Sequence, residues 1–537
     1  MNDDQSNEHP IPHDLDRTLH TQLARLTQGI SPASIVGAYL DWLTHLAMSP
    51  GKQQELAARA ARKSLHFGLY AAKAAFKQGS KPCIEPLPQD RRFAAPEWQQ
   101  WPFNLIYQAF LLNQQWWHKA TTGVSGVTAH HEHVATFSTR QLLDIFSPSN
   151  FLLTNPEVLA ETMKTGGMNL LQGAQKQWQD ALRFANGKPL PGTEDFRPGK
   201  EVALTPGNSL VRYLVEKGHT VFIMSWKNPD SGDSHLGMDD YLKAGVMAAL
   251  DAVTSIIPGQ RIQALGYCLG GTLLSIAAAF MARSHDKRLK SLALLASEID
   301  FKEPGELGLF IDESQLAFLD SVMASKGYLD GKQMAGAFAL LNSRDLVWSR
   351  MEHNYLMGRT RPVSDLAAWN LDATRMPYRQ HSEYLRKLYL RNDLAEGRYR
   401  VNGRPVALSD IRVPIFALGT QRDTVSPWHA AYKITLLTHA EVTFCLCSGG
   451  HNVGVVNPPG AGVKRSYQLA TREAGAYYMD PDTWLATAPE YEGSWWPALD
   501  DWLQRQTSQR VVPPAMGNQA NGYPALEDAP SRYVLVP

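Results

Sequence analysis

The chain has 537 residues, of which 44% are hydrophobic and 19% are charged, so it is long enough for several domains and globular in composition. Its 52 basic residues balance its 52 acidic residues, which argues against a nucleic-acid-binding protein or one held on an anionic membrane by net charge. No secretory leader is visible, and the longest apolar run, Leu273 to Ala282, is about half as long as a membrane span. We therefore expect a cytoplasmic protein with no membrane span.

The first third of the chain has the periodicity of helices. Stretches rich in alanine, glutamine and leucine, such as Gln53 to Lys77 and Pro102 to Lys119, repeat their apolar residues at helical spacing between segments rich in proline, glycine and serine. This pattern predicts an N-terminal, mainly α-helical domain over residues 1–195.

From about residue 200 short apolar runs alternate with amphipathic helices. The helices are expected near Ser209 to Lys217, Tyr241 to Ile256 and Thr272 to Arg283. The strands are expected at Glu201 to Thr205, Thr220 to Trp226, Ile262 to Cys268, Leu289 to Ala296, Pro414 to Leu418 and Glu441 to Leu446. Strand and helix alternating in this way predict an α/β domain over residues 196–505 with a largely parallel, doubly wound sheet.

A long insertion and a tail interrupt or follow this pattern. The stretch of about 298–410 is longer than a crossover between strands requires, and we interpret it as a helical cap over the active edge of the sheet. Its aromatic residues could line an acyl channel or simply pack; they are Trp348, Tyr355, Trp369 and Tyr384. Residues 506–537 lack periodicity and are expected to form an extended C-terminal tail.

The strongest chemical signal is a cysteine between glycines, in the run Leu265 to Gly271. It stands between an apolar strand and a helix of small residues, where the flanking glycines allow a sharp turn. The positive end of the following helix would favour a thiolate at Cys268. The alternative is an inert buried cysteine, which is common for a lone Cys.

Two residues downstream complete the pattern of a nucleophilic site. Asp423 follows the strand predicted at Pro414 to Leu418, and His451 follows the last predicted strand after two glycines. The order nucleophile, acid, histidine is typical of the α/β-hydrolase fold, so we expect an α/β-hydrolase-like sheet with these three as the catalytic triad. Cys445 and Cys447 alternate within a strand and are expected to pack, and no Cys/His group completes a metal site.

With these residues in view, the chain resembles poly(3-hydroxyalkanoate) synthases, the polymerases of intracellular polyester granules, over nearly its whole length. Its motifs are more similar to those of the single-subunit, short-chain-type branch than to those of the medium-chain branch. The matching stretches are Phe146 to Phe151, Ser225 to Asp230, the cysteine run, Glu303 to Gly308, Gly327 to Gly331, Asn370 to Pro377, Gly449 to Pro459 and Ser494 to Pro497.

The resemblance implies a role for each site residue. Cys268 would carry the growing acyl chain, and His451 would remove its proton. Asp423 would support His451 or assist activation of the monomer hydroxyl. The substrate would be an (R)-3-hydroxyacyl-CoA together with the growing polyester chain, with no cofactor. The family also implies a homodimer and association with the granule surface and granule-associated proteins. On physical grounds, the backbone N–H of Leu269 is expected to stabilise the oxyanion, with a second donor from an upstream loop.

That upstream loop is where the chain departs from the family. Gly207 joins Asn208 directly, and roughly 40 residues that would hold a central strand and the strand-to-helix oxyanion loop are missing. Either Glu201 to Thr205 replaces that strand, or the activity is impaired. Two alternatives to the polymerase therefore remain: a cysteine-dependent acyl-CoA thioesterase or hydrolase of the same fold, and a catalytically impaired granule-binding homologue.

Overall fold

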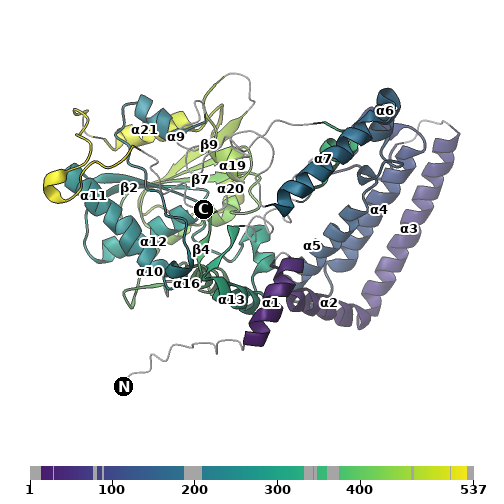
Figure 1. Cartoon of the computed structure of the whole chain (residues 1–537), viewed down its shortest axis with the longest axis horizontal. Helices are drawn as coiled ribbons and strands as arrows, with labels where there is room; N and C mark the ends of the chain where they lie inside the picture. The colour runs from purple at the N-terminus through teal and green to yellow at the C-terminus, as the bar shows by residue number, and fades with distance from the viewer. Residues whose placement is uncertain are drawn as a thin grey trace. The chain divides into compact units, whose positions relative to one another are not determined.

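The computed structural model describes residues 14–27, 29–76, 81–87, 90–186, 208–331, 343, 347–359, 374–460, 465–507 and 510–528. The chain divides into two compact units (Figure 1). The sheet unit contains residues 1–25, 196–334 and 364–537, and the helical unit contains residues 26–195 and 335–363. The described parts confirm the predicted fold class, an α/β sheet domain together with a mainly helical N-terminal region.

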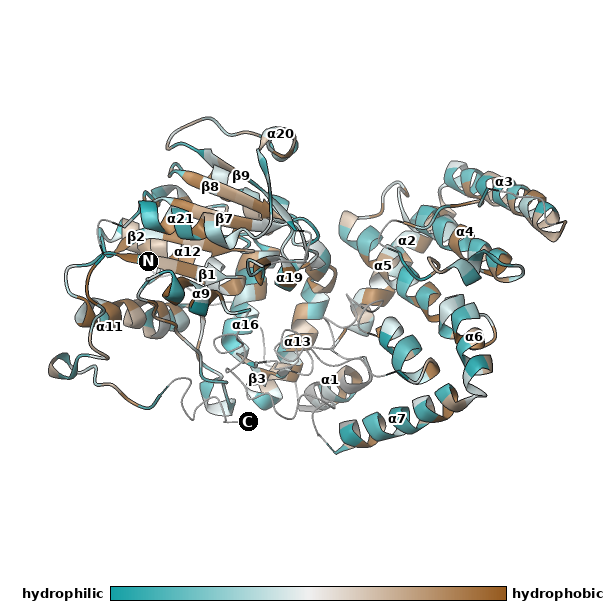
Figure 2. Ribbon diagram, turned by 90° about the horizontal axis from the view of Figure 1, so that it is seen from above, coloured by the Kyte–Doolittle hydropathy of each residue, from teal (hydrophilic) through white to brown (hydrophobic). Residues whose placement is uncertain are grey.

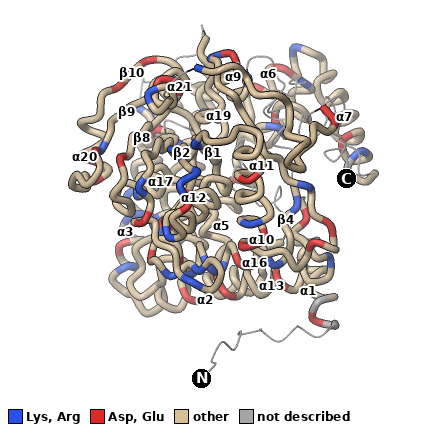
Figure 3. The backbone as a smooth tube through the Cα atoms, turned by 90° about the vertical axis from the view of Figure 1, so that its left-hand side faces the viewer, with Lys and Arg blue, Asp and Glu red and all other residues tan. Residues whose placement is uncertain are grey.

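Charge and hydropathy along the chain agree with the composition. Basic and acidic residues are interspersed along the tube rather than gathered by sign (Figure 3). Among the helices that the structure describes, none is both long enough and apolar enough to cross a lipid bilayer.

A six-stranded sheet organises the sheet unit, in the order β1-β2-β7-β8-β9-β10. Strands β1 to β8 of this series are parallel, while β9 is antiparallel to β8 and β10 to β9. The first four confirm the strands predicted from Ile262, Leu289, Pro414 and Glu441, whereas β9 and β10 were not predicted. The strand bounds are Ile262–Tyr267 (β1), Leu289–Leu295 (β2), Ile415–Thr420 (β7), Val442–Cys447 (β8), Ser466–Arg472 (β9) and Glu490–Glu492 (β10).

The central strands are buried on both faces, as a doubly wound sheet requires. Successive side chains of β7 alternate between two hydrophobic clusters: Ile415 and Ala417 pack with α12 (Leu269–Arg283), whereas Phe416 and Leu418 pack with the tryptophans of α21 (Trp496–Arg505). Cys445 and Cys447 of β8 lie fully buried in the second cluster, which confirms their prediction as packing residues. The hydrophobic colour of β7 and β8 is visible in Figure 2.

The remaining elements of the sheet unit are short. On the α21 face, α9 (Leu210–Glu216) confirms the helix predicted there. The others are α1 (Asp14–Thr27, of which the last two residues belong to the helical unit), η3 (Ser231–Asp233), α10 (Met238–Asp240), η4 (Tyr241–Met247), α11 (Ala248–Ile256), η5 (Gly305–Phe310), α13 (Glu313–Lys326), β3 (Tyr328–Leu329), β4 (Met376–Pro377), α16 (Tyr378–Tyr384), η8 (Leu385–Leu390), β5 (Arg400–Val401), β6 (Arg404–Pro405), η9 (Leu408–Asp410), α17 (Trp428–Tyr432), α18 (Ile434–Leu437), α19 (His451–Val455), α20 (Pro481–Thr487) and η10 (Gln519–Asn521).

One predicted strand does not form. Residues 218–230 have no regular structure, so the strand predicted at Thr220 to Trp226 is wrong. In the described sheet β1 pairs only with β2, and a cavity of about 1110 Å³ lies between β1 and this segment. A strand needs a ladder partner for its N–H and C=O groups, and the described residues provide none for this segment. The predicted substitute, Glu201 to Thr205, lies outside the described residues.

The helical unit contains long helices and a separate core. Phe93, Trp98, Tyr107 and Leu111 form one cluster, in which the ring of Phe93 stacks on that of Tyr107 with centroids 5.3 Å apart. The bounds are α2 (Pro32–Ala47), α3 (Pro50–Ala75), η1 (Pro96–Gln99), α4 (Phe103–Thr121), α5 (Ala129–Ile145), η2 (Pro148–Asn150), α6 (Pro156–Thr165), α7 (Met168–Ala185) and η7 (Met351–Leu356).

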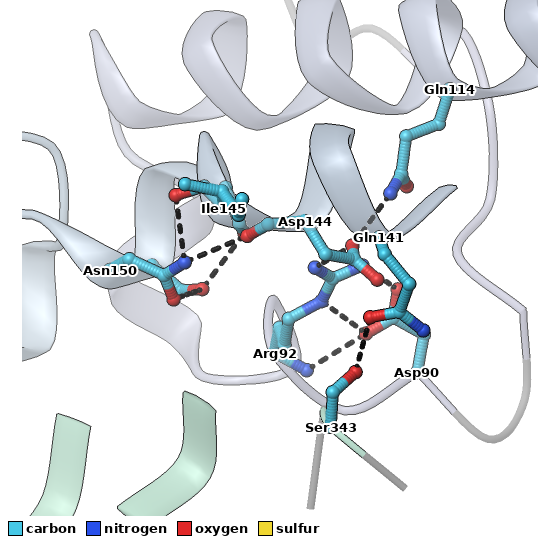
Figure 4. A network of polar contacts seen from close by, with 10 residues as sticks. Asp90, Arg92, Gln114, Gln141, Asp144, Ile145, Asn150 and Ser343 are labelled. Carbon is cyan, nitrogen blue, oxygen red and sulfur yellow. Dashed lines mark hydrogen bonds and ion pairs between the residues drawn. The ribbon is translucent and has the colours of Figure 1, made fainter. Parts of the chain in front are cut away.

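A buried ionic network ties the segments of this unit together (Figure 4). The Arg92 guanidinium donates to both carboxylate oxygens of Asp90, at 3.0 and 2.8 Å, and to Asp144 Oδ1 at 2.7 Å. The Asp144 carboxylate also accepts from Gln114 Nε2 at 2.8 Å. One guanidinium group thereby compensates the charges of two carboxylates. Its hydrogen bonds offset part of the free-energy cost of burying these charges.

Part of the predicted cap packs inside the helical unit. Asn169 of α7 donates through Nδ2 to the carbonyl of Leu356 at 2.8 Å, and Tyr355 donates through its hydroxyl to Asp180 Oδ2 at 3.0 Å. A Cβ on Gly173 would lie 1.8 Å from the carbonyl oxygen of Tyr355, so η7 and α7 are in direct backbone contact. These contacts favour ordinary packing for Tyr355, while Trp369 lies outside the described residues. The domain limits drawn from the sequence stay a prediction.

Candidate active site

Cys268 occupies a strained turn between β1 and α12. Its backbone has φ 52° and ψ −126°, a conformation with positive φ that residues other than glycine rarely adopt. The turn begins directly after the β1 ladder, because the N–H of Cys268 still donates to the carbonyl of Leu295 on β2 at 2.9 Å. The side chain is thus held at the carboxyl end of the sheet, as the strand-to-helix pattern predicted.

Close packing around the turn explains two glycines but not the third. A Cβ on Gly266 would lie 2.6 Å from Cα of Gly271, and one on Gly271 would lie 1.9 Å from Oγ of Ser297. A Cβ on Gly270 would meet no atom within 4 Å. From the sequence, the steric role was expected for Gly266 and Gly270, which flank the cysteine symmetrically. In the structure, Gly266 and Gly271 have this role, because β1 and α12 approach each other there.

Asp423 and His451 come from the next strands of the sheet and face each other. Asp423 follows β7, His451 begins α19 after β8, and His451 Nδ1 lies 2.7 Å from Asp423 Oδ2. The Asp423 side chain has no exposed surface and accepts at Oδ1 from the N–H groups of Val425 (2.9 Å) and Ser426 (2.8 Å). These backbone donors fix the orientation of the carboxylate, so it can select one tautomer and one ring position for His451.

The second group that acts on His451 is the side chain of Cys268. Cys268 lies close enough to the imidazole to act on its proton affinity, so the structure places the three predicted triad residues near one another; their catalytic roles stay a prediction. Burial lowers the pKa of His451, but the hydrogen bonds with Asp423 and Cys268 and the negative charges of both outweigh burial and raise that pKa to about 10. An imidazole that lies between a carboxylate and a cysteine can take up the proton of the thiol, which is the arrangement of an activated cysteine nucleophile.

A tyrosine and an asparagine next to the triad hold the histidine ring from one side. The ring of Tyr267 stacks on that of His451 with centroids 5.4 Å apart, and its hydroxyl donates to Asn452 Oδ1 at 2.6 Å. Both residues are direct neighbours of triad residues in sequence. The sequence analysis nevertheless missed them, because their relevance depends on the sheet bringing β1 and α19 together.

The oxyanion role of Leu269 stays a prediction, and its place in the fold is compatible with that role. It is the first residue of α12, and the first N–H groups of a helix have no partner within the helix. Its N–H follows Cys268 directly, so an acyl carbonyl on the sulfur would lie within its reach. The second donor was predicted in the segment before Asn208, which lies outside the described residues.

The structure also reveals an acidic residue that the sequence analysis missed. Glu298 follows β2, is 5% exposed, and lies near enough to Cys268, Asp423 and His451 for their charges to act on it. Its only sequence signal was its position just after a predicted strand. Within the described residues no group of three or more histidine, cysteine or acidic side chains is arranged to hold a metal ion.

Comparison with known proteins gives this geometry a family. Residues 89–216 match the model of the poly-beta-hydroxybutyrate polymerase N-terminus, and residues 10–52 match a second N-terminal model of that polymerase. Residues 204–458 match the α/β-hydrolase fold model. A poly(3-hydroxyalkanoate) polymerase of Methylorubrum extorquens is 34% identical in an alignment that covers 92% of this chain and 89% of that relative. The chain belongs to the poly(3-hydroxyalkanoate) polymerase family.

Further relatives of the polymerase family match over similar lengths. The polymerase subunit of Rhizobium meliloti is 33% identical and covers 83% of this chain and 80% of its own. That of Cupriavidus necator is 34% identical and covers 86% and 85%. Membership confirms the predicted family and the predicted enzyme class, an acyltransferase.

Proposed function

We propose that the chain polymerises (R)-3-hydroxyacyl-CoA into polyhydroxyalkanoate through an acyl thioester on Cys268. The observation that carries the proposal is the series from Asp423 through His451 to Cys268 in a chain of this polymerase family. The substrate class follows from the printed names of the relatives and from the motifs that the chain shares with them.

The first half of the cycle loads the enzyme. The Cys268 thiolate attacks the thioester carbon of the acyl-CoA, the N–H of Leu269 stabilises the tetrahedral oxyanion, and the carbon–sulfur bond to CoA breaks. The imidazolium of His451 gives its proton to the departing CoA sulfur. One thioester replaces another, so the acyl group stays activated at little change in free energy.

The second half extends the polymer. His451, now neutral, accepts the proton of a 3-hydroxyl group as that oxygen attacks the acyl carbon on Cys268. The bond to sulfur breaks, an oxoester forms, and the thiolate–imidazolium pair is restored. The oxoester is the more stable linkage, which drives the transfer forward and favours a cysteine over a serine in this position.

The assembly that we propose follows the same family. The active form is a homodimer that associates with the surface of the polyester granule and with granule-associated proteins in the cytoplasm. The segment of about 298–410 acts as a cap that limits the access of water, the competing nucleophile. Gel filtration with light scattering tests the dimer, and sedimentation with isolated granules tests the association.

Replacing the nucleophile tests the proposal directly. Cys268→Ala is expected to abolish release of CoA from 3-hydroxybutyryl-CoA, formation of polymer and covalent acyl labelling, because no other group at the turn can form the thioester. Thiol release, turbidity and the mass of the intact protein measure the three products. Cys83→Ala, which removes a half-buried cysteine of the helical unit, is the matched control and is expected to keep all three. Labelling of Cys268→Ala would contradict the mechanism.

The side of β1 that has no strand neighbour among the described residues favours a second candidate. The cavity beside β1 lies where the family's additional strand was expected, and such a cavity would give water a route that a closed sheet would block. A thioesterase would release hydroxy acid and CoA in equal amounts without turbidity. A catalytically impaired granule-binding homologue would bind granules and release no CoA. Product analysis with the same substrate separates the three.

A further inference from the structure

Four adjacent parallel strands each end at a titratable side chain, and the triad uses only three of them. Cys268 follows β1, Asp423 follows β7 and His451 begins the helix after β8, while Glu298 follows β2, between the first two. Because the carboxyl ends of parallel strands share one edge of the sheet, the Glu298 carboxyl belongs to the same edge as the triad. The proposed cycle gives it no task.

The backbone that carries Glu298 is fixed at three points. Ala296 has φ 45°, a strained value for a residue with a side chain, and its N–H donates to the carbonyl of Leu418 on β7 at 2.8 Å. Ser297 donates through Oγ to the carbonyl of Leu295 at 3.0 Å, and Thr272 of α12 donates through Oγ1 to the carbonyl of Glu298 at 2.6 Å. Strained turns held in this way gather at functional sites.

The carboxyl itself is buried, and Tyr389 lies near enough to act on its pKa. The Tyr389 hydroxyl lies 3.4 Å from that of Tyr384, one of the aromatic residues of the predicted cap. Oε1 of Glu298 is buried and has no hydrogen-bond partner among the residues that the structure describes. An unsatisfied buried oxygen of this kind is costly unless a ligand completes it.

Charge indicates the state of this group. Burial, the charge of Cys268 and the charge of Asp423 raise the pKa of Glu298 well above its ordinary value, against smaller opposing effects from Tyr389 and His451. The raised pKa favours the neutral carboxylic acid, which can both donate and accept a hydrogen bond. A neutral acid suits an uncharged hydroxyl group better than a phosphate or a carboxylate.

The substrate class supplies one such hydroxyl. An acyl group bound to Cys268 carries its 3-hydroxyl oxygen four bonds from the sulfur, and the turn that holds Glu298 packs against the start of the helix that follows Cys268. We propose that Glu298 binds the 3-hydroxyl group of the acyl chain and thereby selects 3-hydroxyacyl over plain acyl thioesters. This inference rests on the proposed acyl transfer through Cys268.

A comparison of two thioesters in two proteins tests this role. Single-turnover acylation is measured by intact mass for the wild type and Glu298→Leu, each with 3-hydroxybutyryl-CoA and with butyryl-CoA, which lacks only the hydroxyl. We expect the wild type to favour the hydroxylated thioester by about tenfold or more and Glu298→Leu to lose that preference. Butyryl-CoA lacks the hydroxyl group and Glu298→Leu lacks the carboxyl group, so each change removes the same hydrogen bond. Butyryl transfer should change little.

Control variants separate recognition from a structural effect. Glu298→Gln keeps the size and a donor, and is expected to retain more of the preference than Glu298→Leu even if the latter folds poorly. Asp500→Asn removes another buried carboxyl, on α21, and should leave the preference unchanged. An equal loss for both thioesters, or an unchanged preference in Glu298→Leu, would overturn the inference. Failure of the wild type to accept either thioester would instead refute the proposed function.

Discussion

His451 is the residue on which two opposing effects meet. Burial disfavours the charged form of its imidazole. Asp423 and Cys268 favour that form, and their combined effect outweighs the effect of burial. The same interactions that prepare the nucleophile therefore also stabilise the folded state, as long as the imidazole stays protonated. The catalytic arrangement and the pH dependence of stability have one cause.

A pH series tests this link. The pKa of His451 is about 10 in the folded state against 6.5 for the free side chain. A raised pKa means that the stabilisation is complete below about pH 6.5 and is lost as the pH rises towards about 10. Denaturant titration measures the free energy of unfolding of the wild type and of His451→Gln at each pH. The wild type should exceed the variant most at the acidic end of the series. A difference that stays constant over this range would contradict the argument.

At the scale of elements, the approach of β1 to α12 decides where the nucleophile stands. The contact between Gly266 and Gly271 leaves no room for a Cβ, and Ser297 fills the remaining space from the turn after β2. The turn that presents Cys268 and the turn that presents Glu298 are thus packed against each other. A change in one is expected to move the other.

Two neighbouring glycines of α12 offer a matched test of this packing. Gly271→Ala places a methyl group 1.9 Å from Ser297 Oγ and is expected to destabilise the fold by about 1 to 3 kcal/mol and to reduce acylation of Cys268. Gly270→Ala meets no atom within 4 Å and should stabilise the helix by about 0.5 kcal/mol. Thermal melting and acylation rates measure both variants; equal effects would show that helix propensity, not close approach, governs the turn.

At the scale of the whole molecule, the chain builds two units with separate cores. The sheet unit is held by apolar layers on both faces of its strands, whereas the helical unit adds the buried network around Arg92. The network joins the segment before α4 to the end of α5, and both carboxylates depend on one cation. Removing that cation should act on the helical unit first.

Arg92→Met tests how far the network supports this unit. The substitution leaves the buried carboxylates of Asp90 and Asp144 without their cation and is expected to destabilise the helical unit by about 3 to 5 kcal/mol. Arg359→Met breaks the more exposed pair with Glu161 and should cost less than about 1 kcal/mol. Calorimetry measures both, and comparable losses in the two variants would contradict the assigned importance of burial.

Local sequence was sufficient for much of this protein. The four central strands, the helices between them and the order of Cys268, Asp423 and His451 depend on periodicity and on turn residues, which neighbouring positions determine. The family motifs are likewise contiguous. The strand expected at Thr220 to Trp226 does not form, because an apolar pattern alone cannot supply a ladder partner and the described residues contain none for it.

Other features exist only once distant segments meet. The need for glycine at Gly271 arises from Ser297, and the position of Glu298 beside the triad arises from the strand order, in which β2 lies next to both β1 and β7. The side of β1 that has no strand neighbour among the described residues similarly became visible only in the assembled sheet. Local patterns therefore determined the elements and the chemistry of this protein, while tertiary contacts alone decided which side chains share the site, because such contacts join residues that the sequence keeps far apart.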